Sequence, residues 1–194
     1  MQSILSFVLA FFTTITTQGY TVQYTREVPA QVDNLTLRLH CQAEYPGYWY
    51  WNYGVTSIDV LEENGTVLQT LSVDIDDGYW VTQCWNKDGD LFVEDLNFDG
   101  FPDLRLMEGA GVVNLAYLCW LWNPETGQYQ YASRLYGYDV ILDSENKQIL
   151  TESRDGWGQY YTDTYAYDES GQLRHLKQVH EDYAEGTTTT TIYD

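Results

Sequence analysis

Short runs of strand-forming residues alternate with turn signals along the chain from about Tyr20 onward. Segments rich in Val, Ile, Thr, Tyr and Trp are broken by clusters of Gly, Asn and Asp, and helical periodicity is nearly absent. The breaks come about every eight to twelve residues, a spacing typical of an antiparallel all-β fold. We therefore expect one all-β domain over 20–194, with about ten or more strands.

The turn clusters hold residues that tolerate a positive φ or hydrogen-bond their own backbone, so each predicts the tip of a β-hairpin. They are Glu62–Gly65, Asn86–Gly89, Asn123–Gly127, Asp143–Asn146 and Asp168–Gly171. Hairpins in such a series can form a sandwich, a barrel or a small propeller.

Two segments have distinct expected positions in the sheets. The run Val112–Trp122 is uncharged and lacks Gly and Pro, which predicts a central strand buried on both faces. The run Thr187–Thr191 has high β-propensity, and we expect a terminal strand with one solvent-exposed face.

The first residues differ from the rest. Met1–Gly19 carries no charge, and its apolar run Ile4–Phe12 is too short to span a membrane as a helix but suits the core of a secretory signal. We expect residues 1–19 to be a signal peptide and the protein to be exported, with an N-terminal core strand or a truncated start as the alternatives.

The charge balance narrows the possible partners. Nine Lys and Arg against 29 Asp and Glu give a formal net charge of −20, so the chain cannot build the basic face that nucleic acids or anionic membranes require. Apolar residues make up 44% of the chain and aromatic residues 16%, enough for a folded core. The acidic surface would attract metal ions or a basic protein.

The three cysteines, Cys41, Cys84 and Cys119, fit neither a disulfide scaffold nor a zinc cluster. A single Cys84–Cys119 disulfide is the preferred pairing, and buried free thiols are an equally good alternative.

One segment has the pattern of a calcium loop. Asp95, Asn97, Asp99 and Asp103 place oxygen-bearing side chains at alternate positions, Phe101 can add its backbone carbonyl, and Gly100 allows a sharp turn. Three carboxylates and an amide suit Ca²⁺ better than Mg²⁺. The residue at the twelfth position is a leucine and strand-like residues flank the loop, so it resembles the calcium hairpins of integrin-type propeller blades and not an EF-hand. A merely solvated acidic turn is the alternative.

Two stretches resemble a known family. Val93–Leu106 (VEDLNFDGFPDLRL) and Trp120–Leu135 (WLWNPETGQYQYASRL) are similar to small exported bacterial proteins with an acidic calcium loop in a β-propeller-like fold. That family includes immunity proteins that inhibit the lysozyme-like, peptidoglycan-hydrolysing effectors of type IV secretion systems. The resemblance implies a small β-propeller-like domain, with a β-sandwich as the alternative, in a periplasmic, cell-surface or secreted protein. No cysteine lies near the expected cleavage point, so the lipid anchor of some relatives is not expected.

Aromatic segments are the candidate partner-binding sites. Trp49 and Trp51 lie in the densest aromatic cluster, and glycines flank Trp157, with Tyr160 close behind. Tyr and Trp are enriched at binding hot spots, although strand aromatics of the first cluster can equally pack in the core. A cationic cell-wall hydrolase would suit both the charge and these anchors.

Enzymatic motifs are missing from the chain: it has no nucleophile elbow, zinc-protease helix, phosphate loop or dinucleotide fingerprint. We therefore expect a binding protein and not an enzyme. The main alternative is a calcium-stabilised carbohydrate-binding module, in which exposed Trp and Tyr stack on sugars.

Overall fold

The structure is a computed structural model that describes residues 20–45, 52–75, 82, 90–111 and 113–193. These residues form thirteen strands, and the strand prediction is confirmed. The strands are β1 (Tyr20–Pro29), β2 (Thr36–Tyr45), β3 (Asn52–Leu61), β4 (Val67–Ser72), β5 (Leu91–Glu94), β6 (Asp103–Ala110), β7 (Leu115–Asn123), β8 (Gln128–Gly137), β9 (Asp139–Asp143), β10 (Gln148–Arg154), β11 (Gln159–Tyr167), β12 (Leu173–Asp182) and β13 (Thr187–Ile192). None of the described residues forms a helix that could cross a membrane.

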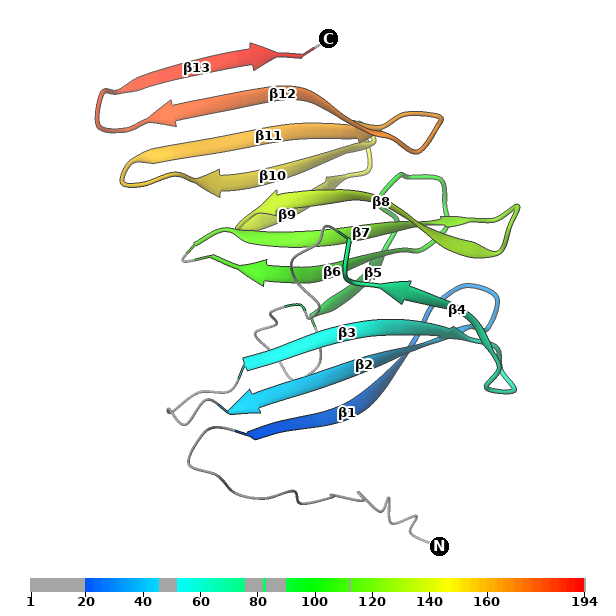
Figure 1. Ribbon diagram of the computed structural model, residues 1–194. Helices are drawn as coiled ribbons and strands as arrows, with labels where there is room; N and C mark the ends of the chain where they lie inside the picture. The colour runs from blue at the N-terminus through cyan, green and yellow to red at the C-terminus, as the bar shows by residue number, and fades with distance from the viewer. Residues whose placement is uncertain (1–19, 46–51, 76–81, 83–89, 112, 194) are drawn as a thin grey trace, which may run out of the picture.

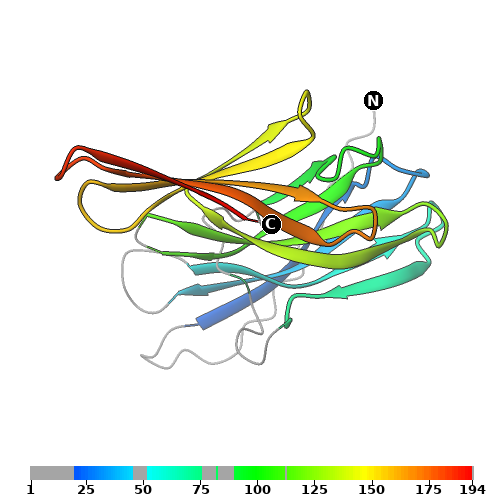
Figure 2. The same cartoon turned by 90° about the horizontal axis from the view of Figure 1, so that it is seen from above.

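The strands form three antiparallel meanders, in which each strand pairs with its neighbours in sequence. Sheet A has the order β1-β2-β3-β4, sheet B has the order β5-β6-β7-β8, and sheet C has the order β13-β12-β11-β10-β9. The meanders follow one another through the molecule, from the blue strands of sheet A to the red edge of sheet C (Figure 1). Viewed from above, the strands of sheet C cross over sheet B (Figure 2).

Sheet B lies between two hydrophobic clusters and is therefore the central layer. The cluster on one face joins Leu104, Leu106 and Leu118 of sheet B to side chains of sheet A. The cluster on the other face joins Met107 and Leu135 of sheet B to side chains of sheet C.

Strand β7 shows this two-sided burial most clearly. Trp120 and Trp122 belong to the cluster with sheet A, whereas Tyr117, Cys119 and Leu121 belong to the cluster with sheet C. Because alternate side chains of a strand point to opposite faces, a run that is apolar at every position suits a strand covered on both sides. The central strand predicted within Val112–Trp122 is confirmed at Leu115–Asn123.

Most of the described turns form through side-chain caps at their first residue. Asn123 Oδ1 accepts the N–H groups of Glu125 and Thr126, and Asp143 Oδ1 accepts those of Glu145 and Asn146. Such caps replace a ladder bond with a local one and reverse the chain. Four of the five predicted hairpin tips are confirmed, and the fifth, Asn86–Gly89, lies outside the described residues.

Strand β13 differs from the expectation of one exposed face. All six of its residues are exposed, so both faces contact solvent. In the described part of the chain β13 packs closely only on β12. The hairpin end of β12 and β13 projects beyond the green strands of sheet B at the left of Figure 2.

Cys119 carries a free thiol with no exposed surface, and desolvation raises the pKa of this thiol to about 12. The expected Cys84–Cys119 disulfide is therefore wrong, and the alternative of a buried free thiol holds at Cys119. Cys84 lies outside the described residues.

Candidate functional site

The acidic loop 95–103 connects β5 to β6 and folds around its own first residue. Asp95 Oδ1 accepts the N–H of Asp99 at 3.1 Å, and Asp95 Oδ2 accepts the N–H of Gly100 at 3.0 Å. Asp99 Oδ1 in turn accepts the N–H of Phe101 at 2.9 Å. Gly100 has a φ of 92°, and Phe98, a non-glycine residue, has a φ of 60°. The side chains of Asp95 and Asp99 thus cap backbone N–H groups a few residues further along the loop, and the loop coils tightly as a result.

Asp103 has a different environment from the other loop carboxylates because it is fully buried. Its Oδ2 accepts the N–H of Leu96 at 2.8 Å and that of Asn97 at 3.3 Å, and its Oδ1 accepts the N–H of Trp122 at 2.8 Å. The last bond joins the loop to the central strand β7. Asp103 therefore closes the loop and couples it to the core.

Burial also changes the protonation of Asp103. The pKa of Asp103 is raised to about 7, first because desolvation disfavours the charged carboxylate. The N–H donors of Trp122 and Leu96 oppose this shift, and the negative charge of Asp99 adds to it. A cation close to Asp103 would favour its ionised form.

The donor set of the loop fits a hard cation. Each side-chain oxygen of Asp95 and Asp99 accepts a hydrogen bond, and a carboxylate oxygen has room for a second partner. Asn97 Nδ2 donates to Asp99 Oδ2 at 2.9 Å. In the described residues, however, no three His, Cys, Asp or Glu side chains are gathered closely enough to form a metal centre. Calcium binding by Asp95, Asn97, Asp99, Phe101 and Asp103 stays a prediction.

The second candidate site is at the opposite end of the sheets, in the loop between β10 and β11. Trp157 is 85% exposed and stands between Gly156 and Gly158, whose φ values are 75° and 78°. The loop is closed by the N–H of Asp155, which donates to the carbonyl of Gln159 at 3.1 Å. The two positive φ values turn the chain sharply on both sides of the indole.

The β12–β13 turn lies against this loop. The N–H of Tyr183 donates to the carbonyl of Gly158 at 2.9 Å. The ring of Tyr160, which is half-buried, packs edge-to-face on Tyr183 with a centroid distance of 5.2 Å. A side chain at position 158 would come within 3.5 Å of the backbone of Ala184. Two hairpin tips far apart in sequence thus form one surface.

Two tyrosines at the end of β8 extend this aromatic end. Tyr136 and Tyr138 are exposed and flank Gly137, where a Cβ would lie 2.6 Å from the carbonyl oxygen of Glu152. The N–H of Tyr138 donates to that same oxygen at 2.7 Å. The pKa of Tyr138 is raised, first by desolvation and then by its contact with the Glu152 carboxylate. We call Tyr136, Tyr138, Trp157, Tyr160 and Tyr183 the aromatic end.

The structure describes two of the four predicted partner-binding residues. Trp157 and Tyr160 lie together at the aromatic end, whereas Trp49 and Trp51 lie outside the described residues. Sequence reasoning missed Tyr136, Tyr138 and Tyr183. No local motif distinguishes them from other tyrosines. The pairing of β11 with β12 brings Tyr183 beside the Trp157 loop, whereas Tyr136 and Tyr138 reach this end through the approach of the end of β8 to β10.

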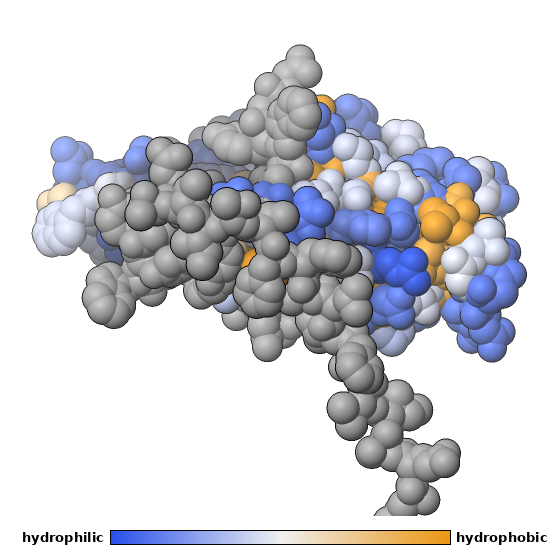
Figure 3. Space-filling view, turned by 60° about the horizontal axis from the view of Figure 1, so that its bottom comes forward, coloured by the Kyte–Doolittle hydropathy of each residue, from blue (hydrophilic) through white to orange (hydrophobic). Residues whose placement is uncertain are grey.

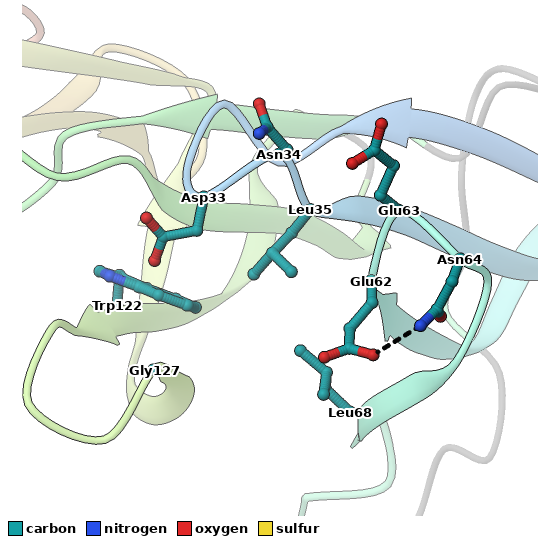
Figure 4. A pocket seen from close by; sticks show the side chains of 9 residues that line it. All are labelled: Asp33, Asn34, Leu35, Glu62, Glu63, Asn64, Leu68, Trp122 and Gly127. Atoms are coloured by element: carbon teal, nitrogen blue, oxygen red, sulfur yellow. Dashed lines mark hydrogen bonds between the residues drawn. The ribbon is translucent and has the colours of Figure 1, made fainter.

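A third feature, which the sequence did not indicate, is a cleft of about 640 Å³. It lies between the β1–β2 loop, the β3–β4 turn and the β7–β8 turn (Figure 4). Asp33, Glu62 and Glu63 supply its charges, and Trp122 and Leu68 supply apolar surface. Glu62 Oε2 accepts a hydrogen bond from Asn64 Nδ2 at 3.2 Å.

Figure 3 shows the described surface on the side of sheet A. Hydrophilic residues cover most of the part that is visible in Figure 3, and hydrophobic patches interrupt it mainly toward the right-hand end. In β4, the edge strand of sheet A, Val67 and Leu68 are exposed apolar residues.

Comparison of the chain with protein-family models, with curated proteins and with solved structures finds no match. The functional argument therefore depends on the residues and their geometry.

Proposed function

We propose that this protein is an exported, calcium-stabilised binding protein that inhibits a cationic cell-wall hydrolase and catalyses no reaction itself. The observation that carries the proposal is the aromatic end, where Trp157 is exposed beside Tyr183 on a chain of net charge −20. Exposed aromatic side chains supply binding energy at small interfaces, and the acidic field favours a basic partner. Many lysozyme-like hydrolases are basic because their substrate is anionic.

The surroundings of the aromatic end support a cationic partner. Glu152 contacts Tyr138, Asp155 closes the Trp157 loop, and Asp182 caps the β12–β13 turn. Glu152 lies against Tyr138, and Asp155 and Asp182 lie within two residues of Trp157 and Tyr183 along the chain. A lysine or arginine of the partner could therefore contact both a carboxylate and an aromatic face.

The fold that we propose is a small β-propeller-like domain, in which each meander acts as one blade. The two-sided burial of sheet B supports this arrangement, because a propeller blade packs on a neighbour through each face. A β-sandwich, extended by a third layer, is the alternative. Within this domain Ca²⁺ would supply a structural charge at the loop 95–103, held by the side chains of Asp95, Asn97, Asp99 and Asp103 and the Phe101 carbonyl.

The test is inhibition of a panel of basic peptidoglycan hydrolases by the purified chain at low ionic strength. Trp157→Ala should weaken inhibition by at least about tenfold, the scale of a modest hot spot. Leu68→Ala, at an exposed apolar residue near the acidic cleft, is the matched control and should inhibit as the wild type does. The association rate should fall steeply as salt rises.

A calcium-stabilised carbohydrate-binding module is the second candidate, and the exposure of Trp157 is the observation that favours it. An indole that is free on its faces can stack on a sugar ring. Strong retention on insoluble peptidoglycan, with no inhibition of any hydrolase at low salt, would replace the inhibitor proposal with this one.

A further inference from the structure

Among the described strands, β13 is at the edge of sheet C, and its backbone alternates between bonded and outward-facing residues. The N–H of Tyr193 donates to the carbonyl of Leu176 at 3.0 Å, and the register of β13 on β12 continues unshifted through Thr191 and Gln178. In an antiparallel ladder, bonded residues alternate with residues whose N–H and C=O groups point away. The backbone groups of Thr188, Thr190 and Ile192 therefore point away from β12.

This edge lacks the features that normally prevent strand pairing. Edge strands are usually protected by charges, proline or bulges. Strand β1, another edge, carries Arg26, Glu27 and Pro29, and β9 carries Asp139 and Asp143. The β13 sequence TTTTTI has no charge, no proline and no register shift, and all of its residues are exposed.

The charge around β13 favours a second copy of this chain as the partner. Segment 173–192 carries Arg174 and Lys177 against Glu181, Asp182 and Glu185, so its net charge is 2 − 3 = −1, compared with −20 for the whole chain. The three carboxylates flank or occupy the β12–β13 turn, away from the middle of β13. Repulsion between two copies is therefore weak along this edge, whereas a basic partner would be attracted to the acidic ends.

We propose that two copies of this chain dimerise by antiparallel pairing of their β13 strands about a two-fold axis at Thr190. In this register Thr190 pairs with Thr190 of the second copy, and Thr188 pairs with its Ile192. Each such pair exchanges two N–H···O bonds, about six in total, and joins two five-stranded sheets into one. Threonine lies opposite threonine or isoleucine, with no like charges facing one another.

Disulfide trapping tests the register directly. Paired residues at a bonded position are about 5.5 Å apart between Cα atoms, within the range that a disulfide spans. Thr190→Cys should therefore form a covalent dimer under mild oxidation. Thr189→Cys is the matched control, because its symmetry mate is displaced by two residues and lies beyond disulfide reach. Equal cross-linking of the two variants would overturn the proposed register.

Light scattering coupled to size exclusion tests the dimer itself, with the native chain at rising concentration and salt. The dimer fraction should increase with salt, because salt screens the repulsion between the acidic bodies. Thr190→Pro should weaken dimerisation at least about tenfold while keeping the monomer fold, since the Thr190 N–H makes no bond to β12. Thr190→Val, which keeps the N–H group, should still dimerise. A wild-type chain that stays monomeric at all concentrations, or that forms open-ended oligomers, would refute the proposal.

Discussion

Different kinds of interaction hold the turns at the two ends of the sheets. At the end that holds the acidic loop, several turns are held by a side-chain cap within their own sequence, as with Asp95 on Gly100 and Asp168 on Gln172. At the aromatic end, Trp157 and Tyr183 become neighbours only because β11 pairs with β12. Asp182 also caps the β12–β13 turn at the aromatic end, but the contact between the two hairpin tips there depends on the pairing of the sheet and not on local sequence. The responses of the two ends to mutation should differ accordingly.

The largest effect should come from Asp103, where the acidic loop meets the core. Asp103→Ala leaves the N–H groups of Leu96, Asn97 and Trp122 without their acceptor and opens a cavity, which should cost about 3–5 kcal/mol of unfolding free energy. Asp99→Ala removes an exposed carboxylate from the same loop and should cost about 1 kcal/mol when chelator is present. Urea unfolding of both variants measures the difference, and equal losses would mean that Asp103 does not couple the loop to β7.

Calcium binding at the acidic loop should also raise the free energy of unfolding, by less than Asp103→Ala lowers it. A ligand that binds only the folded chain adds about 2.7 kcal/mol at a hundredfold excess over its Kd. Chelation should lower the melting temperature of the wild type, and Asp99→Ala should melt at the same temperature with and without Ca²⁺. A wild-type melting temperature that chelator leaves unchanged would identify the loop as a solvated acidic turn.

At the aromatic end the most sensitive residue should be a glycine and not an aromatic side chain. Gly137→Ala places a Cβ 2.6 Å from the Glu152 carbonyl oxygen, so β8 and β10 must separate. We expect a loss of about 1–3 kcal/mol, similar to other overpacked sites. Gly109→Ala is the control for lost backbone freedom, because its Cβ would meet nothing within 4 Å and its φ, like that of Gly137, lies outside the left-handed region. Denaturant unfolding that shows no greater loss for Gly137→Ala would contradict the close approach of the strands.

A pH titration should affect the capped turns more than the aromatic surface. The pKa of Asp168 is lowered, first by the hydroxyl of Ser170, then by the N–H of Gln172 and the side chain of Arg174. Ionised Asp168 therefore contributes stability above its ordinary pKa of 3.8, and this contribution is lost as pH falls through the lower, folded-state value.

Asp168→Asn keeps an amide cap that does not titrate. The melting temperature of the variant should lie below that of the wild type at neutral pH, and the difference should shrink in acid. A difference that is independent of pH would show that the ionised form of Asp168 gains nothing in the folded state.

The smallest effect on stability should be that of Trp157→Ala. The indole is 85% exposed, so its removal should change the unfolding free energy by no more than about 0.5 kcal/mol. The same variant should show the largest loss of hydrolase inhibition. Thermal unfolding measured beside inhibition separates these effects, and a strong destabilisation would show that Trp157 packs in the fold.

The sequence predicted much of the fold because its signals were local. The side chains of Asn123 and Asp168 can accept hydrogen bonds from nearby backbone N–H groups, which predicts turns. The unbroken apolar run ending at Trp122 indicates a strand covered on both faces. It did not predict that Asp103 points into the core, because a carboxylate in a calcium-like pattern gives no sign of its burial. The exposure of both faces of β13 was also not predictable, since it depends on which elements pack against the edge of sheet C.

The burial of sheet B on both faces has a consequence for how the chain folds and unfolds. Each meander pairs strands that are adjacent in sequence, so closing its loops costs little conformational entropy and the meander can form early in folding. Both hydrophobic clusters, however, depend on side chains of sheet B, and neither outer sheet keeps its cluster once sheet B is lost. Local opening should therefore begin in β12 and β13, and exchange of the β7 amides should require global unfolding.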